Sequence, residues 1–221
     1  MAFKRLGSLM QLDSHADNEN DTFTMSEQMQ RAKEQIEYYL SGINLEKDKY
    51  FTDLMNQSND KYIPASVFME CQRIKQIGIL IDDLVLACSK SHFLDVDVEH
   101  QKIRPKTPFF NDIRRKFRTL RMSGFPTNAT VDNIYDFLLA NVYEPESIVP
   151  QVSRNDDGEF IFNGTVHVLF FDEETAELTL KAQLTYENRN IYIETITKYE
   201  NKRKRYEKKN ESKNTTSGND K

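Results

Sequence analysis

The chain has 221 residues, of which 38% are hydrophobic and 29% charged, an ordinary composition for globular domains with polar ends and enough for two small cores. No apolar run approaches the roughly eighteen residues of a membrane span, and the N-terminus lacks a signal-peptide core, so we expect an intracellular protein without membrane contact. A net charge of −5 argues against a protein that coats phosphate indiscriminately, and two cysteines, Cys71 and Cys88, are too few for a disulfide framework.

Residues 1–24 are polar and acidic, and we expect them to be disordered. The next segment has the pattern of an amphipathic helix, because its apolar residues recur every three or four positions. This stripe consists of Met25, Met29, Ala32, Ile36 and Leu40. Thr24 and Glu27 fit a capping box that would start the helix.

An amide and several tyrosines lie beside this stripe. Gln35, Tyr38 and Tyr39 are related as i, i+3 and i+4, so they lie close together on the helix. Asp48 and Tyr50 follow within reach of the same surface. Rings that stack bases and a carboxylate that accepts from ribose hydroxyls suit RNA, whereas the alternative is partly buried tyrosines with their hydroxyls in water.

Residues 25–105 are predicted to form helices followed by a β-hairpin, the pattern of a winged helix. Residues 84–88 give one helical face, residues 94–98 alternate as a strand does, and residues 102–104 provide the return strand. Asp82 and Asp83 near the start of the last helix disfavour a DNA-reading recognition helix.

Residues 106–117 read as a basic linker, and residues 118–199 as a second domain in βαββαβ order. Strands are expected at 119–123, 147–152, 159–170 and 191–193, and helices around 134–138 and 175–182. Asp157 and Gly158 signal a hairpin turn. Pro150 restricts its strand to a sheet edge. Residues 200–221 are expected to form a basic helix and a disordered tail, and their basic cluster is typical of a nuclear localisation signal.

Residues 25–105 resemble the La motif, the RNA 3′-end-binding module of La proteins. The matching segments are Gln35 to Tyr50, Tyr62-Ile63-Pro64, Arg73-Ile74 and Ala87 to Ser91. The resemblance implies a pocket for the last two nucleotides of an RNA that ends in uridines with free hydroxyls, lined by Gln35, Tyr38, Tyr39, Asp48 and Tyr50. Where the family has Phe-Asn-Arg, this chain has Cys71-Gln72-Arg73, so Gln72 and Arg73 join the expected site. One stacking ring is missing at Cys71, and Phe68, one helical turn earlier, is the candidate replacement.

Residues 120–125 and 163–170 resemble the two signatures of the RNA-recognition motif. The positions that usually carry stacking aromatics hold Arg121, Thr165 and His167, so the sheet is expected to be a poor stacking platform. Arg121 is kept as an RNA-binding residue through charge or hydrogen bonding, and the alternative is a solvated side chain on an open sheet face.

The expected fold class is α+β, a winged-helix La motif followed by an RNA-recognition motif, with disordered termini. The La resemblance implies a nuclear, monomeric RNA chaperone that binds the free 3′ oligo-uridine ends of RNA polymerase III transcripts such as tRNA precursors. We expect no catalysis, cofactor, metal or small-molecule substrate, although Cys88 and His92 have the i, i+4 spacing of a helical metal site. The alternatives are a La-related protein dedicated to one small nuclear or telomerase RNA, disfavoured because the chain stops at Lys221, and a protein-binding adapter.

Overall fold

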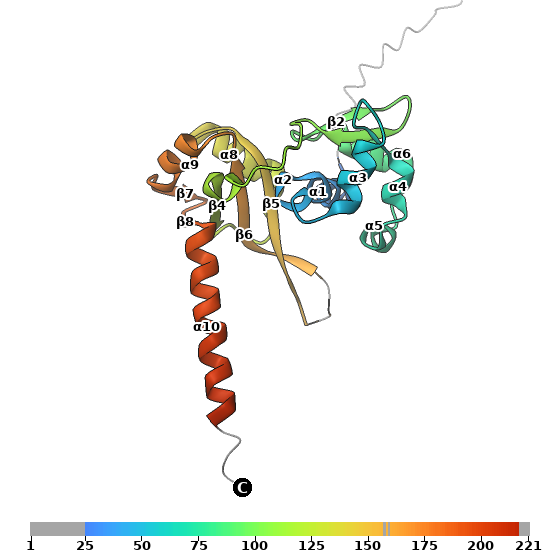
Figure 1. The fold of residues 1–221 in the computed structure, drawn as a ribbon. Coiled ribbons are helices and arrows are strands. Elements are labelled where there is room, and N and C mark those ends of the chain that lie inside the picture. Colours follow the sequence, from blue (N-terminus) through green and yellow to red (C-terminus); the bar gives the residue numbers. More distant parts are fainter. Residues whose placement is uncertain (1–24, 157, 159, 217–221) are drawn as a thin grey trace, which may run out of the picture.

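The computed structural model describes residues 25–156, 158 and 160–216, which form two domains and a projecting C-terminal helix (Figure 1). The expected disorder of residues 1–24 and of the extreme C-terminus falls outside the described residues. Within the described part, no helix is long and apolar enough to cross a membrane.

The first domain is a winged helix, as predicted. Its elements are α1 (Glu27–Leu40), α2 (Gly42–Leu45), α3 (Lys49–Asn56), β1 (Ile63–Pro64), α4 (Ala65–Met69), α5 (Gln72–Ile77), α6 (Ile81–Cys88), β2 (Leu94–Asp97) and β3 (Lys102–Pro105). The strands form an antiparallel sheet in the order β1-β3-β2. The core includes the predicted stripe from Met29 to Leu40, while Met25 packs against its edge.

Helix α1 begins at a different cap from the one predicted. Ser26 is the N-cap, and its hydroxyl accepts from the backbone N–H of Met29 at 3.2 Å. The capping box from Thr24 is therefore wrong, and Thr24 itself is outside the described residues. A serine directly before the first helical residue satisfies a backbone donor that would otherwise lack a partner.

The second domain has the topology of an RNA-recognition motif. It contains α7 (Arg115–Arg118), β4 (Thr119–Ser123), α8 (Val131–Asn141), β5 (Pro145–Arg154), β6 (Phe160–Phe170), α9 (Glu173–Leu180), β7 (Leu184–Tyr186) and β8 (Arg189–Thr195). The sheet order is β5-β6-β4-β8-β7, with helices α8 and α9 in the crossover connections. Strand β5 is at an edge, so Pro150 lies where the prediction placed it.

Strand β7 was not predicted. It pairs with β8 through a two-residue turn in which Glu187 and Asn188 have positive φ values of 45° and 62°. Such φ values at both central positions characterise a type I′ hairpin. The turn lacks glycine, which hid the strand from the sequence pattern.

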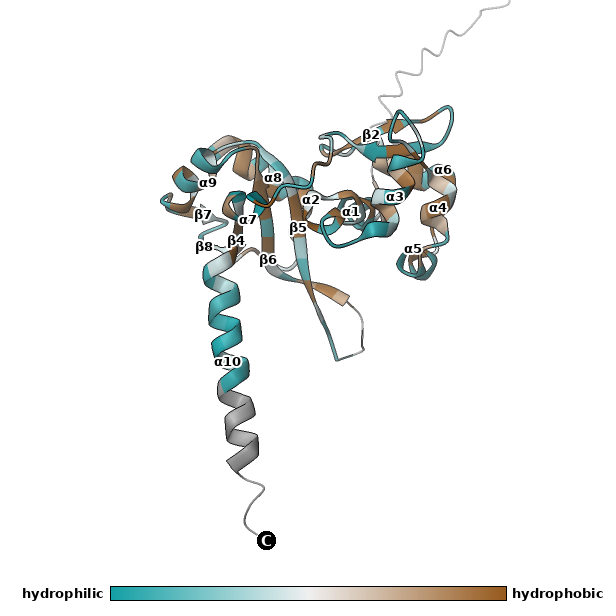
Figure 2. Ribbon diagram, in the orientation of Figure 1, coloured by the Kyte–Doolittle hydropathy of each residue, from teal (hydrophilic) through white to brown (hydrophobic). Residues whose placement is uncertain are grey.

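Helix α10 (Ile196–Thr216) begins against the sheet and then extends away from both domains (Figure 1). Figure 2 shows that its first turns are largely hydrophilic, in contrast to the strands at its base. The basic helix therefore starts at residue 196 rather than 200. Because this helix packs against β4, β8 and α7 at its start, its position is set by tertiary contacts.

The segment predicted as a linker contributes to packing between the domains. Arg115, in the segment expected to be a basic linker, is only 4% exposed. Its guanidinium lies 4.9 Å from the centre of the Phe109 ring and 3.5 Å from Glu46 Oε2 of the first domain. One of the linker's cations therefore helps to hold the two domains together.

A second set of contacts joins α1 to the N-terminal end of α8. Lys33, fully buried, donates to Asp132 Oδ1 at 2.6 Å. The backbone N–H of Val131 donates to Glu34 Oε1 at 3.1 Å, where a carboxylate also complements the helix dipole. These contacts fix the orientation of α8 relative to α1.

His92 belongs to the same junction and not to a metal site. Helix α6 ends at Cys88, so the i, i+4 geometry expected of Cys88 and His92 is wrong. The His92 ring instead stacks on Tyr135 of α8, with centroids 3.9 Å apart and an angle of 12° between the ring planes. In the described part of the chain, no cluster of three His, Cys, Asp or Glu residues could hold a metal ion.

Candidate nucleic-acid interface

The predicted aromatic surface is assembled from α1 and α3. Tyr39 packs its ring on Phe51 with centroids 5.0 Å apart, while Tyr38 lies 6.0 Å from Tyr39. Tyr50 contacts Phe51 from the other side at 5.1 Å. Because Phe51 is buried, it fixes the inner ring, and the outer rings of Tyr38 and Tyr50 are 37% and 57% exposed. Two accessible stacking faces therefore stand beside one anchored ring.

Asp48 is held in place by its role as the N-cap of α3. Its Oδ1 accepts from the backbone N–H of Tyr50 at 3.0 Å, and its Oδ2 lies 3.5 Å from the Asn44 amide. The cap orients the carboxylate without burying it, since Asp48 is partly exposed. Each oxygen already accepts one hydrogen bond within the protein, and because a carboxylate oxygen can accept a second, the partly exposed group can also accept from a ligand at the aromatic surface.

Gln35 carries a buried amide nitrogen without a hydrogen-bond partner among the described residues. Its Oε1 is 3.5 Å from Arg73 Nη1 on α5. Leaving a buried donor unsatisfied costs about 1–3 kcal/mol, so such groups usually have a structural or functional reason. The amide therefore has an unused donor beside the contact of α1 with α5.

Cys71 and Arg73 lie beside the aromatic surface at α5, Cys71 near Tyr39 and Arg73 near Gln35. Burial is the main cause that raises the pKa of Tyr39 to about 12, and the nearby Cys71 adds to the effect. Burial likewise raises the pKa of the Cys71 thiol, which keeps it neutral. Gln72, the first residue of α5, is exposed beside them. Among the candidate site residues of the first domain, only Asp48 and Arg73 are therefore charged.

Phe68 does not replace the ring missing at Cys71. It is fully buried and stacks on Phe51, with ring centroids 5.4 Å apart and planes at 21°. A ring that fills the core has no face for a base, so the expected replacement is wrong.

Arg121 is not part of this pocket, because it lies on the sheet of the second domain under the start of α10. Its Nη1 is 3.3 Å from Glu194 Oε1, and its guanidinium lies 4.7 Å from the centre of the Tyr199 ring. His167 is next to it, and burial together with the positive charge of Arg121 lowers the pKa of His167 to about 4. The sheet face around Arg121 is thus occupied by residues of α10.

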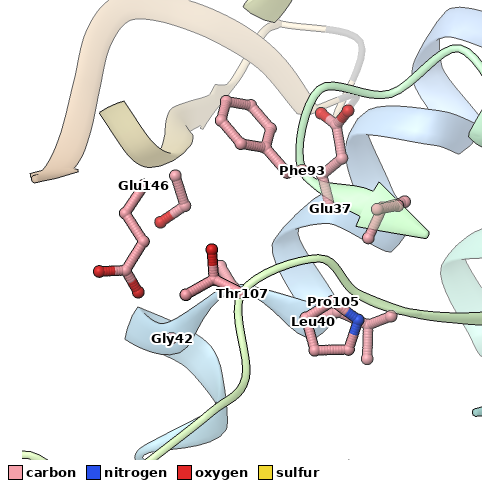
Figure 3. A pocket seen from close by; sticks show the side chains of 10 residues that line it. Glu37, Leu40, Gly42, Phe93, Pro105, Thr107 and Glu146 are labelled. Carbon is pink, nitrogen blue, oxygen red and sulfur yellow. The ribbon is translucent and has the colours of Figure 1, made fainter. Parts of the chain in front are cut away.

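Two features at the contact between the domains had no signal in the sequence. Phe160, at the start of β6, places its ring 4.7 Å from the Arg73 guanidinium, although the two residues belong to different domains. A pocket at the domain junction is lined by residues of both domains and the segment between them, among them Leu40, Thr107 and Glu146 (Figure 3). Both arise from contacts between segments far apart in the chain.

Residues 32–90 match the model of the La domain. Similar curated proteins include a La protein homolog from Drosophila melanogaster, 25% identical over 80% of this chain and 48% of that protein. A Lupus La protein homolog from Rattus norvegicus is 30% identical over 47% of this chain and 27% of the relative. A La-related protein 6A from Arabidopsis thaliana is 24% identical over 72% of this chain and 39% of the relative. The chain thus spans about half or less of the length of these relatives.

Among solved structures, the La autoantigen N-terminal domain matches with 18% identity and a TM-score of 0.37, over 41% of this chain and 99% of that chain. The winged helix followed by an RNA-recognition-motif fold places the protein in the class of two-domain RNA-binding proteins. The chain thus contains a La domain at residues 32–90 and is similar in sequence to La protein homologs.

Proposed function

We propose that this protein binds the 3′ end of single-stranded RNA that terminates in uridines with free hydroxyls. The observation that carries the proposal is the juxtaposition of a buried, unpartnered amide donor on Gln35 with the exposed rings of Tyr38 and Tyr50 and the capped carboxylate of Asp48. A base needs stacking faces and a hydrogen-bond partner for its edge, and a terminal ribose needs an acceptor for its hydroxyls.

Each side chain has a distinct role in this mechanism. The Asp48 carboxylate accepts from the 2′- and 3′-hydroxyls of the last ribose, a pair of charge-assisted bonds that DNA cannot provide. The same negative charge repels a 3′-phosphate. Gln35 Nε2 donates to a carbonyl oxygen of uracil, while Tyr38 and Tyr50 stack on bases.

Binding of this kind hides the RNA end from exonucleases and needs no chemical step. We propose that the bound RNAs are newly made RNA polymerase III transcripts such as tRNA precursors, that the protein acts on them as a monomeric nuclear chaperone, and that it aids their maturation. The support is the La-domain match together with the similarity to La protein homologs. Similarity to La-related protein 6A makes a La-related protein dedicated to one small RNA the second candidate.

The test compares a ten-nucleotide RNA ending in four uridines and a free 3′-hydroxyl with the same RNA carrying a 3′-phosphate. We expect the free end to bind at least about tenfold more tightly, which corresponds to about 1.4 kcal/mol. Asp48→Ala should abolish this preference, as measured by fluorescence anisotropy. Asp53→Ala, which removes a carboxylate from the same helix outside the cap, is the matched control and should preserve it. Equal affinity of the wild-type protein for the two ends would refute the proposal.

A further inference from the structure

The long hairpin of the second domain reaches the edge of the La-domain pocket. Strands β5 and β6 pair regularly from Ser147 to Gln151. The register then shifts, and pairing resumes between Val152 and Phe162. Such a bulge bends a hairpin and re-aims its side chains. Figure 1 shows the distal part of this hairpin extending well beyond the rest of the sheet.

A glycine is required next to the bend. Gly164 has a φ of 76°, and a Cβ there would lie 2.4 Å from the Phe125 carbonyl oxygen. That carbonyl belongs to the loop after β4, whose Gly124 and Phe125 backbone N–H groups both donate to the Gly164 carbonyl oxygen. The bend is therefore anchored to the body of the domain, and the distal strands are held in one direction.

An aromatic side chain stands at the end of this hairpin between two cations. The Phe160 ring has the Arg73 guanidinium carbon at 4.7 Å from its centre and that of Arg154, its cross-strand partner, at 4.9 Å. The ring is nevertheless 45% exposed. The exposed part of the ring offers a surface on which a base can stack, and the guanidinium groups beside it supply positive charge for the adjoining phosphates.

The cluster is continuous with the pocket for the RNA end. Arg73 also approaches Gln35, with 3.5 Å between Nη1 and Oε1, so one side chain borders both places. Within the La domain, the neighbour Cys71 offers no stacking face. Phe160 is the ring that the second domain brings to this side of the pocket.

We propose that Phe160, Arg154 and Arg73 form a subsite, shared between the two domains, for the nucleotide that precedes the terminal pair of a bound RNA. The base stacks on Phe160, and the two arginines attract the phosphates on either side of it. This inference rests on the proposed function, because the terminal pair must occupy the pocket of Gln35 and Asp48. It adds a binding residue from the second domain that acts through stacking on a hairpin and not through the sheet face.

The experiment measures how affinity grows with RNA length. NMR titration gives dissociation constants for UU and UUUU, each with a free 3′-hydroxyl, on the wild-type protein and on Phe160→Ala, Phe160→Trp and Phe171→Ala. We expect Phe160→Ala to bind UUUU about tenfold or more weakly with little change for UU, and Phe160→Trp to retain the wild-type constants. Phe171, a 50% exposed ring elsewhere in the same domain, is the matched control.

Two results would overturn the subsite. Unchanged affinity of Phe160→Ala for UUUU would show that the ring does not contact RNA, and an equal loss for UU and UUUU would show that the cation–π contacts only orient the domains. A 3′-phosphorylated UUUU separates this inference from the proposed function. If wild-type binding is indifferent to that phosphate while Phe160→Ala still weakens UUUU, the end-recognition mechanism fails and the stacking site remains.

Discussion

At the scale of single residues, the pocket depends on side chains that are anchored on one side and accessible on the other. Phe51 is the buried ring against which Tyr39 and Tyr50 pack. Asp48 is oriented by the backbone N–H of Tyr50, so the carboxylate and this ring are positioned together. Their rigidity reduces the conformational entropy that RNA binding would otherwise cost.

Tyr50 tests the stacking role directly, since its ring is 57% exposed and contributes little to the core. Tyr50→Ala should weaken binding of a uridine-ended RNA by about 1–3 kcal/mol, the usual contribution of one stacked base, with a much smaller effect on the free energy of unfolding. Tyr50→Phe keeps the ring and should bind as the wild type does. Calorimetric titration measures both variants, and similar losses for Ala and Phe would assign the effect to the hydroxyl instead of the stacking face.

At the scale of elements, α10 determines what the sheet of the second domain can contact. The Tyr199 ring of this helix lies over Arg121 and 6.4 Å from the His167 ring. Lys202 reaches Glu194 at 2.7 Å from the same helix. Helix α10 thus covers the sheet positions that carry stacking aromatics in other RNA-recognition motifs. The charged side chains there form ion pairs with one another.

Removing the Tyr199 ring should be visible at His167. Burial lowers the pKa of His167 to about 4, and Arg121 and Lys47 add their positive charges. Tyr199→Ala admits water to this face, so the pKa of His167 should rise toward its ordinary value of 6.5. An NMR titration of the histidine ring protons measures the change. Tyr206→Ala is the control, because Tyr206 lies farther along α10 and is 69% exposed, and it should leave the pKa of His167 unchanged. If Tyr199→Ala retains the low pKa of His167, α10 does not cause the burial of this histidine.

At the scale of the whole molecule, titratable groups buried at the domain junction make the stability of the protein depend on pH. Lys33 is surrounded by Asp132 at 2.6 Å, Glu37 at 3.9 Å and the neighbouring Glu34. Ser91 donates to Glu37 Oε1 at 2.6 Å. Burial is the largest cause that raises the pKa of Glu37 to about 8, in spite of the favourable charge of Lys33.

The raised pKa predicts that the protein loses stability as the pH rises toward 8. Between pH 4.5, the ordinary value for this carboxyl, and about 8, folded Glu37 retains a proton that the unfolded chain has lost. Stability due to this group is therefore complete below pH 4.5 and decreases by up to about 1.4 kcal/mol per pH unit through that window. The lowered pKa of His167 has the opposite effect on stability, which rises with pH, but only below pH 6.5.

Urea unfolding at pH 6.5 and pH 8 isolates the contribution of Glu37. The midpoint of the wild-type protein should fall between these two pH values. Glu37→Gln preserves the side-chain volume and the acceptor for Ser91 but does not titrate, so its midpoint should fall less. Parallel changes in the two proteins would contradict the assignment of this pH dependence to Glu37.

Local sequence patterns determined much of this protein. The spacing of Met29 to Leu40 specified α1 and its buried face, β4 runs from Thr119 to Ser123 as predicted, and Pro150 identified an edge strand. The La resemblance singled out Gln35, Tyr38, Tyr39, Asp48, Tyr50, Gln72 and Arg73, which the structure places on or beside one surface. The role of these residues in RNA binding stays a prediction. The predictions of α1, β4 and the edge strand share a physical reason: helix period, strand alternation and backbone restriction act over a few neighbouring residues.

Only the tertiary structure decided which distant groups meet. It put Phe68 in the core, brought Phe160 to Arg73, covered Arg121 with Tyr199, and buried Lys33 against Asp132 and Arg115 against Phe109. A lysine or arginine in a charge-rich segment has the same local sequence pattern whether it is solvated or buried. Its burial depends on distant partners, and the partner of Lys33 lies 99 residues away in the chain. The sequence by itself therefore determined local elements such as α1 and β4, while long-range packing decided which residues of the two domains meet.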